Sequence, residues 1–227
     1  PNSVRNIRNY AFYNCSGLTS IEIPNSVTSI GNQAFENCTG LKTVINFSNL
    51  TFSKGSSNNG YIAYYATKVI NAPNAVIDGD FIWCNLNGAN TLACYLGEVA
   101  ELTLPADYNG ENYVIGNDAF NGCSSLASVT IGNSVTFIGY EAFENCSNLE
   151  NVYIFDLEAW CNIEFESSAN PLSNGANLYL NGNLVKDLVI PDSVAEIRDA
   201  FSGCSSLESV IIPSGMTSTG TFSDCSN

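Results

Sequence analysis

The stretch that decides the fold is IEIPNSVTSIGNQAFENC, residues 21–38. Ile21 and Ile23 flank Glu22, and this alternation predicts a short strand with one buried face. Pro24 is expected to end the strand, because proline cannot donate a hydrogen bond to a sheet.

The second half of the stretch closes a coil. Val27 and Ile30 are predicted to point inward after the bend, and Gly31 to supply a turn at low steric cost. Phe35 follows as the large core residue and Cys38 as a small one, since cysteine is among the most buried residue types even when unpaired. The stretch therefore predicts one turn of a coil with an apolar interior.

The end of this stretch recurs along the chain as Ala-Phe, once as Thr-Phe, with a cysteine three positions after the phenylalanine. The six phenylalanines are Phe12, Phe35, Phe120, Phe143, Phe201 and Phe222. The first two are 23 positions apart, as are the third and fourth. A fixed period in the twenties, built on apolar residues, indicates a solenoid whose units stack on their neighbours. Stacking predicts ladders of like residues: Ile/Val, Phe and Cys.

These residues closely resemble the BspA-like leucine-rich repeat family, also called the Treponema pallidum-type repeat. The family's unit matches residues 23–44 almost position for position, and the resemblance extends over residues 1–47, 99–154 and 184–213. It implies a right-handed, curved, β-rich leucine-rich-repeat solenoid without catalytic activity. It also implies a surface or secreted protein of a gut or oral Bacteroides-like bacterium, with adhesion to host matrix proteins as the best-known role.

Departures from the period predict two insertions. Phe35 and Phe120 lie 85 positions apart, which is not a multiple of 23. The runs 81–86 and 91–95 around a short Asn/Gly loop predict a β-hairpin, and residues 156–161 predict a short helix with a buried side. The chain is predicted to be a single leucine-rich-repeat domain, 1–227, and a fragment of a longer chain. Its parts are repeats 1–47, insertion 48–98 with the hairpin, repeats 99–154, insertion 155–183 and repeats 184–227.

The charge balance excludes one class of partner. Twenty-two acids against seven bases, with no histidine, give a net charge of −15. Nucleic acid is not expected to bind, because phosphate recognition needs a basic footprint. No apolar run approaches 18 residues, so no direct membrane insertion is predicted in this stretch of chain. The many Asn, Ser, Thr and Gly residues predict a neutral polar surface.

Motifs for catalysis, cofactors and metals are weak, and no catalytic residue, cofactor or metal is predicted. Asp78 and Asp80 resemble the start of a calcium loop, but the twelfth position lacks the required glutamate. Glu164 and Glu166 would share one face of a strand and could serve glycoside hydrolysis. An enzyme would need the two insertions to converge on one pocket lined by Asp78, Asp80, Glu164 or Glu166. For the two glutamates, a solvated strand face is the preferred interpretation.

The nine cysteines admit two interpretations. Disulfides are usual in extracellular proteins. Six of the cysteines, however, occupy one equivalent inward position of the repeat, which favours buried, reduced thiols. Cys84 and Cys94 are the exception, because they could face each other across the predicted hairpin.

The outward residues of the repeat strands are the candidate binding surface. Stacking would align them in two rows on the concave sheet, the face that solenoids commonly use for binding. The candidate protein-binding residues are Glu22, Ile45, Thr103, Thr130, Asn151, Tyr153, Val189 and Ile211. The alternative is an ordinary solvated sheet. A second patch is the cluster Tyr61, Tyr64 and Tyr65, which could bind or could anchor the first insertion to the core.

The sequence thus predicts a non-catalytic binding protein, adhesin-like, at the cell surface or secreted. Its partner would be a protein, with a host extracellular matrix glycoprotein implied by the resemblance. One alternative is a glycan-binding module, favoured if tyrosine and tryptophan residues form an exposed platform; burial of Trp83 and Trp160 would count against it. The other is a structural spacer of a larger surface protein.

Overall fold

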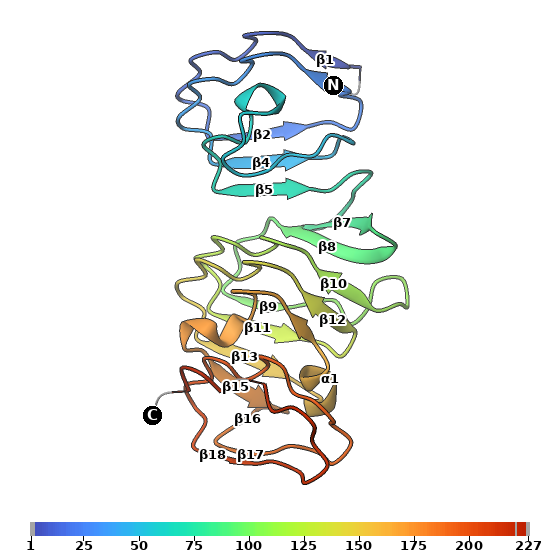
Figure 1. Cartoon of the computed structure of the whole chain (residues 1–227), viewed down its shortest axis with the longest axis vertical. Coiled ribbons are helices and arrows are strands. Elements are labelled where there is room, and N and C mark those ends of the chain that lie inside the picture. The colour runs from blue at the N-terminus through green and yellow to red at the C-terminus, as the bar shows by residue number, and fades with distance from the viewer. Residues whose placement is uncertain (1–2, 221, 226–227) are drawn as a thin grey trace. The chain divides into compact units, whose positions relative to one another are not determined.

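The computed structural model describes residues 3–220 and 222–225. The chain divides into two compact units, residues 1–88 and 89–227. Short strands joined by turns make up both units, and the described residues contain only one α-helix and two short 3-10 helices (Figure 1). The 23-residue period is therefore realised as a β-solenoid, as predicted.

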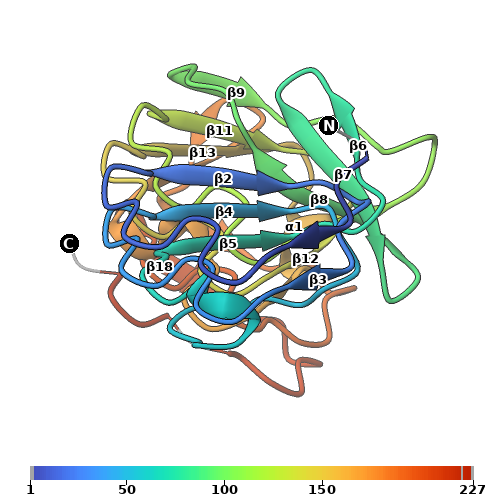
Figure 2. The same cartoon turned by 90° about the horizontal axis from the view of Figure 1, so that it is seen from above.

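Three parallel strands organise the first unit. They are β2 (Ser20–Ile23), β4 (Thr43–Asn46) and β5 (Lys68–Asn71), which lie side by side in Figures 1 and 2. Their inward residues are in register, with Ile21 beside Val44 and Val44 beside Val69. Strands β1 (Asn6–Ile7) and β3 (Ser29–Ile30) form a second parallel pair. The 3-10 helix η1 (Asn59–Tyr61) lies next to β3 (Figure 2).

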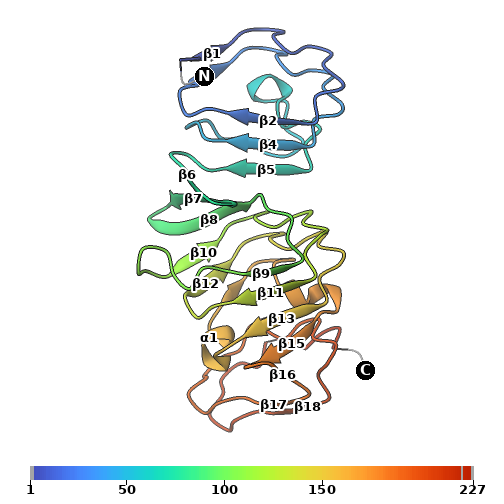
Figure 3. The same ribbon diagram turned by 180° about the vertical axis from the view of Figure 1, so that it is seen from behind.

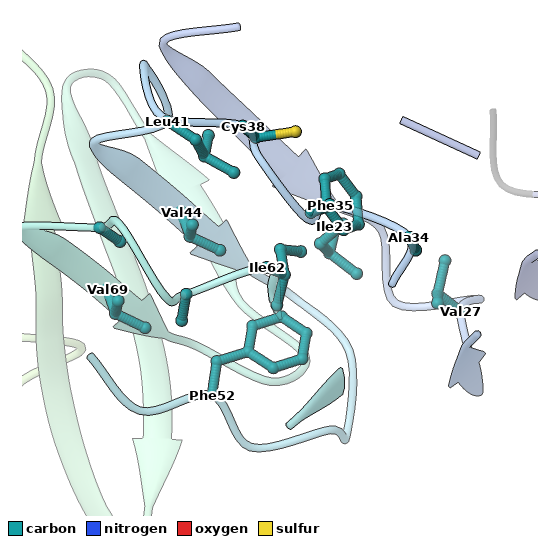
Figure 4. Packing of buried hydrophobic residues seen from close by; sticks show 12 residues of the cluster. Ile23, Val27, Ala34, Phe35, Cys38, Leu41, Val44, Phe52, Ile62 and Val69 are labelled. Carbon is teal, nitrogen blue, oxygen red and sulfur yellow. The ribbon is translucent and has the colours of Figure 1, made fainter. Parts of the chain in front are cut away.

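The coils of the first unit enclose an apolar core. Figure 4 shows Phe35, Val44, Phe52 and Ile62 converging on its interior, and each of them is fully or almost fully buried. The ring of Phe12 stacks on that of Phe35, with centroids 4.8 Å apart and planes 8° apart. The predicted ladder of phenylalanines is confirmed in this unit.

The first unit ends in an antiparallel pair, β6 (Val76–Asp78) and β7 (Phe81–Leu86). Asn87 and Gly88 follow with φ angles of 54° and 88°, the left-handed conformations that a two-residue hairpin turn requires. Strand β8 (Ala89–Tyr95) then opens the second unit. The two strands predicted at 81–86 and 91–95 are confirmed.

A five-stranded sheet, here called the front sheet, organises the second unit (Figure 3). Four strands are parallel and in register, and the fifth is antiparallel at one edge: β9 (Glu101–Thr103), β11 (Ser128–Ile131), β13 (Asn151–Ile154), β15 (Asn177–Leu180) and β16 (Asn183–Leu184). Further parallel pairs join β8 and β12 (Val135–Ile138) to β10 (Tyr113–Ile115), and β14 (Glu164–Phe165) to β12. A separate parallel pair follows, β17 (Asp187–Val189) and β18 (Ser209–Ile211).

Phenylalanines and cysteines stack in the second unit as they do in the first. The rings of Phe120 and Phe143 lie 4.8 Å apart and are inclined by only 4°. The Cys146 thiol donates a hydrogen bond to the carbonyl oxygen of Phe120 at 3.2 Å, and the Cys38 thiol donates to that of Phe12 at 3.0 Å. The repeat cysteine is thus a small core residue that also satisfies a carbonyl of the preceding coil.

The turn glycine of the repeat has a different role from the one predicted. Gly31 is not among the residues with positive φ, whereas Gln33 and Asn37 are, at 53° and 63°. A Cβ atom on Gly31 would lie 2.4 Å from Oδ1 of Asn9, and that oxygen accepts a hydrogen bond from the Asn32 amide. Glycine is needed because the asparagine of the preceding coil passes through this space.

Both predicted insertions contain strands that continue the solenoid. Strand β5 lies within 48–98, and β14 and β15 lie within 155–183. Leu178 pairs beside Val152, and Phe165 beside Ile138. These segments lack the Ala-Phe signature but keep the apolar spacing of the strands. The treatment of residues 1–227 as one domain stays a prediction.

The predicted short helix is confirmed as α1 (Leu157–Cys161). The Asp156 carboxylate caps it by accepting hydrogen bonds from the amides of Glu158 and Ala159. On its buried side, the Trp160 indole donates to the carbonyl oxygen of Ala200 at 2.9 Å. A second 3-10 helix, η2 (Pro171–Asn174), follows. Helix α1 follows β13 at the place where Pro24 follows β2 in the regular repeat.

None of the nine cysteines, Cys84 and Cys94 included, forms a disulfide. Six are buried, while Cys123 and Cys225 are half-buried and Cys15 is exposed. The prediction of reduced core cysteines is confirmed for the buried ones, and the prediction that Cys15 is buried is wrong.

Burial of thiols makes the stability of the fold sensitive to alkali. Desolvation raises the pKa of Cys161 from 9.0 to about 12, with a further contribution from Glu158. The unfolded thiol ionises near pH 9 while the folded one stays protonated, so stability falls as the pH rises from 9 towards 12. We expect Cys161→Ala to flatten this fall by up to about 1.4 kcal/mol per pH unit. Urea unfolding under reducing conditions from pH 8 to 11 measures the free energy of unfolding of both chains. If it fell equally steeply with pH in both, Cys161 would not be the source of the sensitivity.

Candidate interaction surface

The outer face of the front sheet carries two rows of aligned side chains. Alternate residues of β11, Val129 and Ile131, are buried in the core, so the residues between them face outward. One row, here called the polar row, consists of Glu101, Ser128, Asn151 and Asn177. The other, here called the tyrosine row, consists of Thr103, Thr130, Tyr153 and Tyr179.

A stacked pair of tyrosines is the main feature of this face. The rings of Tyr153 and Tyr179 lie 4.8 Å apart, with 28° between their planes. Both side chains are half-buried. Beside them, the Asn177 side-chain amide donates to Oδ1 of Asn151 at 3.4 Å. The pair offers a firm apolar contact area with two hydroxyl groups at its edge, which suits protein recognition.

The eight residues predicted to bind do not all lie on this face. Thr103, Thr130, Asn151 and Tyr153 are brought together in the front sheet. Val189 and Ile211 are neighbours in the separate pair β17–β18 and are 58% and 62% exposed.

The remaining two candidates, Glu22 and Ile45, belong to the first unit. Glu22 is exposed, as expected. Ile45 is only 8% exposed, so the expectation that it forms part of an open row is wrong. Its neighbour on β5, Ile70, is 2% exposed, so apolar packing extends to both sides of these strands.

Two aromatic residues of the second unit were not among the predicted binding residues. Tyr179 lies within the predicted insertion 155–183, but the repeated pattern Asn-Val-Tyr-Ile at 151–154 and Asn-Leu-Tyr-Leu at 177–180 could have revealed it. Phe155 directly follows β13 and is 57% exposed. This exposure could not be predicted from the sequence, because an apolar residue that follows a strand can equally well be buried in the core.

The tyrosine cluster of the first unit is partly exposed. Edge-to-face contacts link Tyr61 to Tyr64 and Tyr64 to Tyr65, with centroids 5.4 and 5.0 Å apart. The buried residues of this segment are instead Ile62 and Ala63. The segment is therefore anchored mainly by its aliphatic residues.

The tryptophans and carboxylates singled out in the sequence have structural roles. Trp83 and Trp160 are each 1% exposed, which excludes an exposed tryptophan platform for sugars. Glu164 forms an ion pair with Arg198, and Oε2 of Glu166 accepts a hydrogen bond from the Tyr140 amide at 2.8 Å. Asp78 and Asp80 are exposed around the turn between β6 and β7.

Neither a metal site nor a membrane span is evident in the part of the chain that the structure describes. Its His, Cys, Asp and Glu residues form no group of three or more able to hold a metal ion. Among residues 3–220 and 222–225, every helix is too short or too polar to cross a bilayer.

Solved structures with related folds come from several bacteria. A leucine-rich repeat protein from Bacteroides ovatus is 25% identical, over 98% of this chain and 57% of that one, with a TM-score of 0.39. A leucine-rich cell surface protein from Faecalibacterium prausnitzii is 18% identical, over 91% and 69%, with a TM-score of 0.40. The pneumococcal vaccine antigen PcpA is 18% identical, over 99% and 59%, with a TM-score of 0.43. This chain thus spans less than two thirds of the first and third of these proteins.

No curated protein matches the chain. The sequence profile of the BspA type leucine rich repeat region matches residues 1–73 and 94–227, in six copies. These ranges include β5, β14 and β15, the strands that the signature alone did not reveal. The profile covers most of the chain. Stacking of phenylalanines and cysteines between coils explains why these residues recur in its repeat. The chain therefore belongs to the BspA-type leucine-rich-repeat family.

Proposed function

We propose that this chain is a non-catalytic, adhesin-like binding protein that recognises a protein partner through the outer face of its front sheet. Its place would be the cell surface or the extracellular medium. The observation that carries the proposal is the stacked pair Tyr153–Tyr179 on an open sheet face. Membership of a family of repeat proteins without known catalytic activity supports it.

The composition of the face favours a protein over other partners. Tyrosine is enriched at protein interfaces because it combines a large apolar area with a polar tip. Here it is flanked by hydroxyl and amide side chains that can pair with a partner's backbone, namely those of Thr130, Asn151 and Asn177. A matrix glycoprotein is the partner class that the family resemblance suggests.

The test is binding of the whole chain to immobilised fibronectin, laminin and collagen, and to a glycan array. We expect saturable binding to at least one matrix protein. The double variant Tyr153→Ala/Tyr179→Ala is expected to weaken it at least tenfold, because central aromatic contacts dominate interface energies. Surface plasmon resonance gives both dissociation constants.

The matched control is Tyr140→Ala, which removes an exposed tyrosine of the same unit that is not on the front sheet. It should bind like the unmodified chain, and thermal melts should show that both variants fold. Matrix-protein binding that survives loss of both front-sheet tyrosines would refute the proposed face. Binding to sugars alone would favour the glycan-binding alternative. No binding at all would favour a structural spacer of a larger surface protein.

A further inference from the structure

The two units of the chain differ sharply in charge. Residues 1–88 hold five of the seven bases and four of the 22 acids, for a net charge of +1. Residues 89–227 hold the other two bases and 18 acids, for a net charge of −16. The net negative charge of the chain thus comes entirely from the unit that contains the front sheet.

Both bases of the second unit are engaged by acids of the same unit. Lys186 pairs with Glu208 at 2.5 Å, and Arg198 pairs with Glu164. These carboxylates raise the pKa of Lys186 and Arg198. The unit is left with sixteen more carboxylates than cations, and its potential should attract positive groups over distances set by the ionic strength.

The front sheet has no positive charge to oppose this attraction. Neither the polar row nor the tyrosine row contains lysine or arginine, and the polar row begins with the exposed Glu101. Glu150, also exposed, immediately precedes the strand that carries Tyr153. The faces of aromatic rings attract cations, and arginine is the side chain that most often stacks on them.

We propose that the partner of this face is a basic polypeptide segment, with arginine or lysine side chains placed against Tyr153 and Tyr179. This inference rests on the proposed function and adds the chemistry of the partner. An acidic protein, an anionic lipid or a nucleic acid would be repelled by the net charge of the unit. A neutral glycan would gain nothing from it.

Charge variants at Thr130 provide the test, because this residue lies between Thr103 and Tyr153 in the tyrosine row. The probe is a fluorescent peptide of eight Arg-Gly repeats, titrated against the whole chain by fluorescence anisotropy in 50 mM NaCl. A peptide of Gln-Gly repeats is the uncharged control. We expect binding of the arginine peptide only, weakened more than tenfold in 500 mM NaCl.

Thr130→Arg and Thr130→Glu place long side chains of opposite charge at the same point. We expect Thr130→Arg to weaken binding of the arginine peptide at least tenfold, and Thr130→Glu to keep or strengthen it. Tyr153→Ala/Tyr179→Ala should weaken it at least tenfold, and Tyr140→Ala less than twofold. Thermal melts check that each variant folds.

Three results would overturn the inference. Equal binding of the glutamine peptide would remove the role of charge. Equal loss from Thr130→Arg and Thr130→Glu would indicate docking governed by shape, which leaves the proposed protein-binding face intact. Arginine-peptide binding unaffected by the front-sheet variants would place the attraction elsewhere on the acidic unit, whatever matrix proteins bind to this face.

Discussion

Replacement of Phe120 with alanine is expected to lower the free energy of unfolding of the chain by about 3–5 kcal/mol. Phe120 is fully buried and touches a ring on each side. Its centroid lies 4.8 Å from that of Phe143 and 5.6 Å from that of Tyr95. Alanine would remove both ring contacts and leave a cavity in the middle of the ladder, which rigid neighbouring coils cannot close. Urea denaturation followed by circular dichroism measures the loss.

Phe155→Ala is the matched control, since it makes the same chemical change at a side chain that is 57% exposed. It is expected to change stability by no more than about 0.5 kcal/mol. Similar losses in the two variants, or a loss below about 1 kcal/mol at Phe120, would contradict the stacking argument.

Gly203→Ala is expected to cost about 2–5 kcal/mol, the sum of two effects. Gly203 has a φ of +79°, a conformation that costs other residues about 1–2 kcal/mol. A Cβ there would also lie 2.3 Å from the carbonyl oxygen of Leu172 and 2.6 Å from Cα of Ser173. Backbone atoms cannot rotate away, so overpacking adds about 1–3 kcal/mol. Thermal or urea unfolding gives the difference.

Gly122 separates the two effects, because it holds the equivalent position before the repeat cysteine. Its φ is +78°, but a Cβ would meet no atom within 4 Å. Gly122→Ala should therefore show only the backbone cost of about 1–2 kcal/mol. Gly122→Asn should cost less than that, since Asn37 and Asn145 adopt φ values of 63° and 59° at the same position. Equal losses at Gly122 and Gly203 would show that close approach of the coils is not what requires glycine.

The regular coils could be predicted from the sequence because their signature is dictated by stacking. A phenylalanine ring and a thiol of fixed size must meet the same groups in each coil, so Ala-Phe and cysteine recur at constant spacing. Strands β5 and β15 were not predicted from the sequence, because a parallel strand needs only apolar residues at alternate positions. Val69 and Leu178 meet that need without any signature.

The loop after β4 shows a second limit. Asn46 stands where β2 has Ile23, and it is fully buried. Its side-chain amide donates to the carbonyl oxygen of Leu50 and to Oδ1 of Asn71, while its own Oδ1 accepts from Ser48. This network directs the chain into an irregular loop. It depends on partners brought together by the fold, so spacing along the sequence could not reveal it.

The candidate site was predictable in its principle and only partly in its members. Alternation in the strands identified Thr103, Thr130, Asn151 and Tyr153 as outward residues of one sheet. Burial of Ile45 and the partnership of Tyr153 with Tyr179 depend on which segments continue the stack. Those segments are the ones that lack the signature.

The in-register rows of the front sheet have a consequence for how such a surface can evolve. Each coil contributes one residue to each row, and neighbouring strands are about 4.8 Å apart. Duplication of one 23-residue unit would therefore lengthen both rows by one step while leaving the contacts within every existing coil unchanged. A gene that gains or loses whole units would alter the reach of its product in fixed increments, without needing a new fold for each partner.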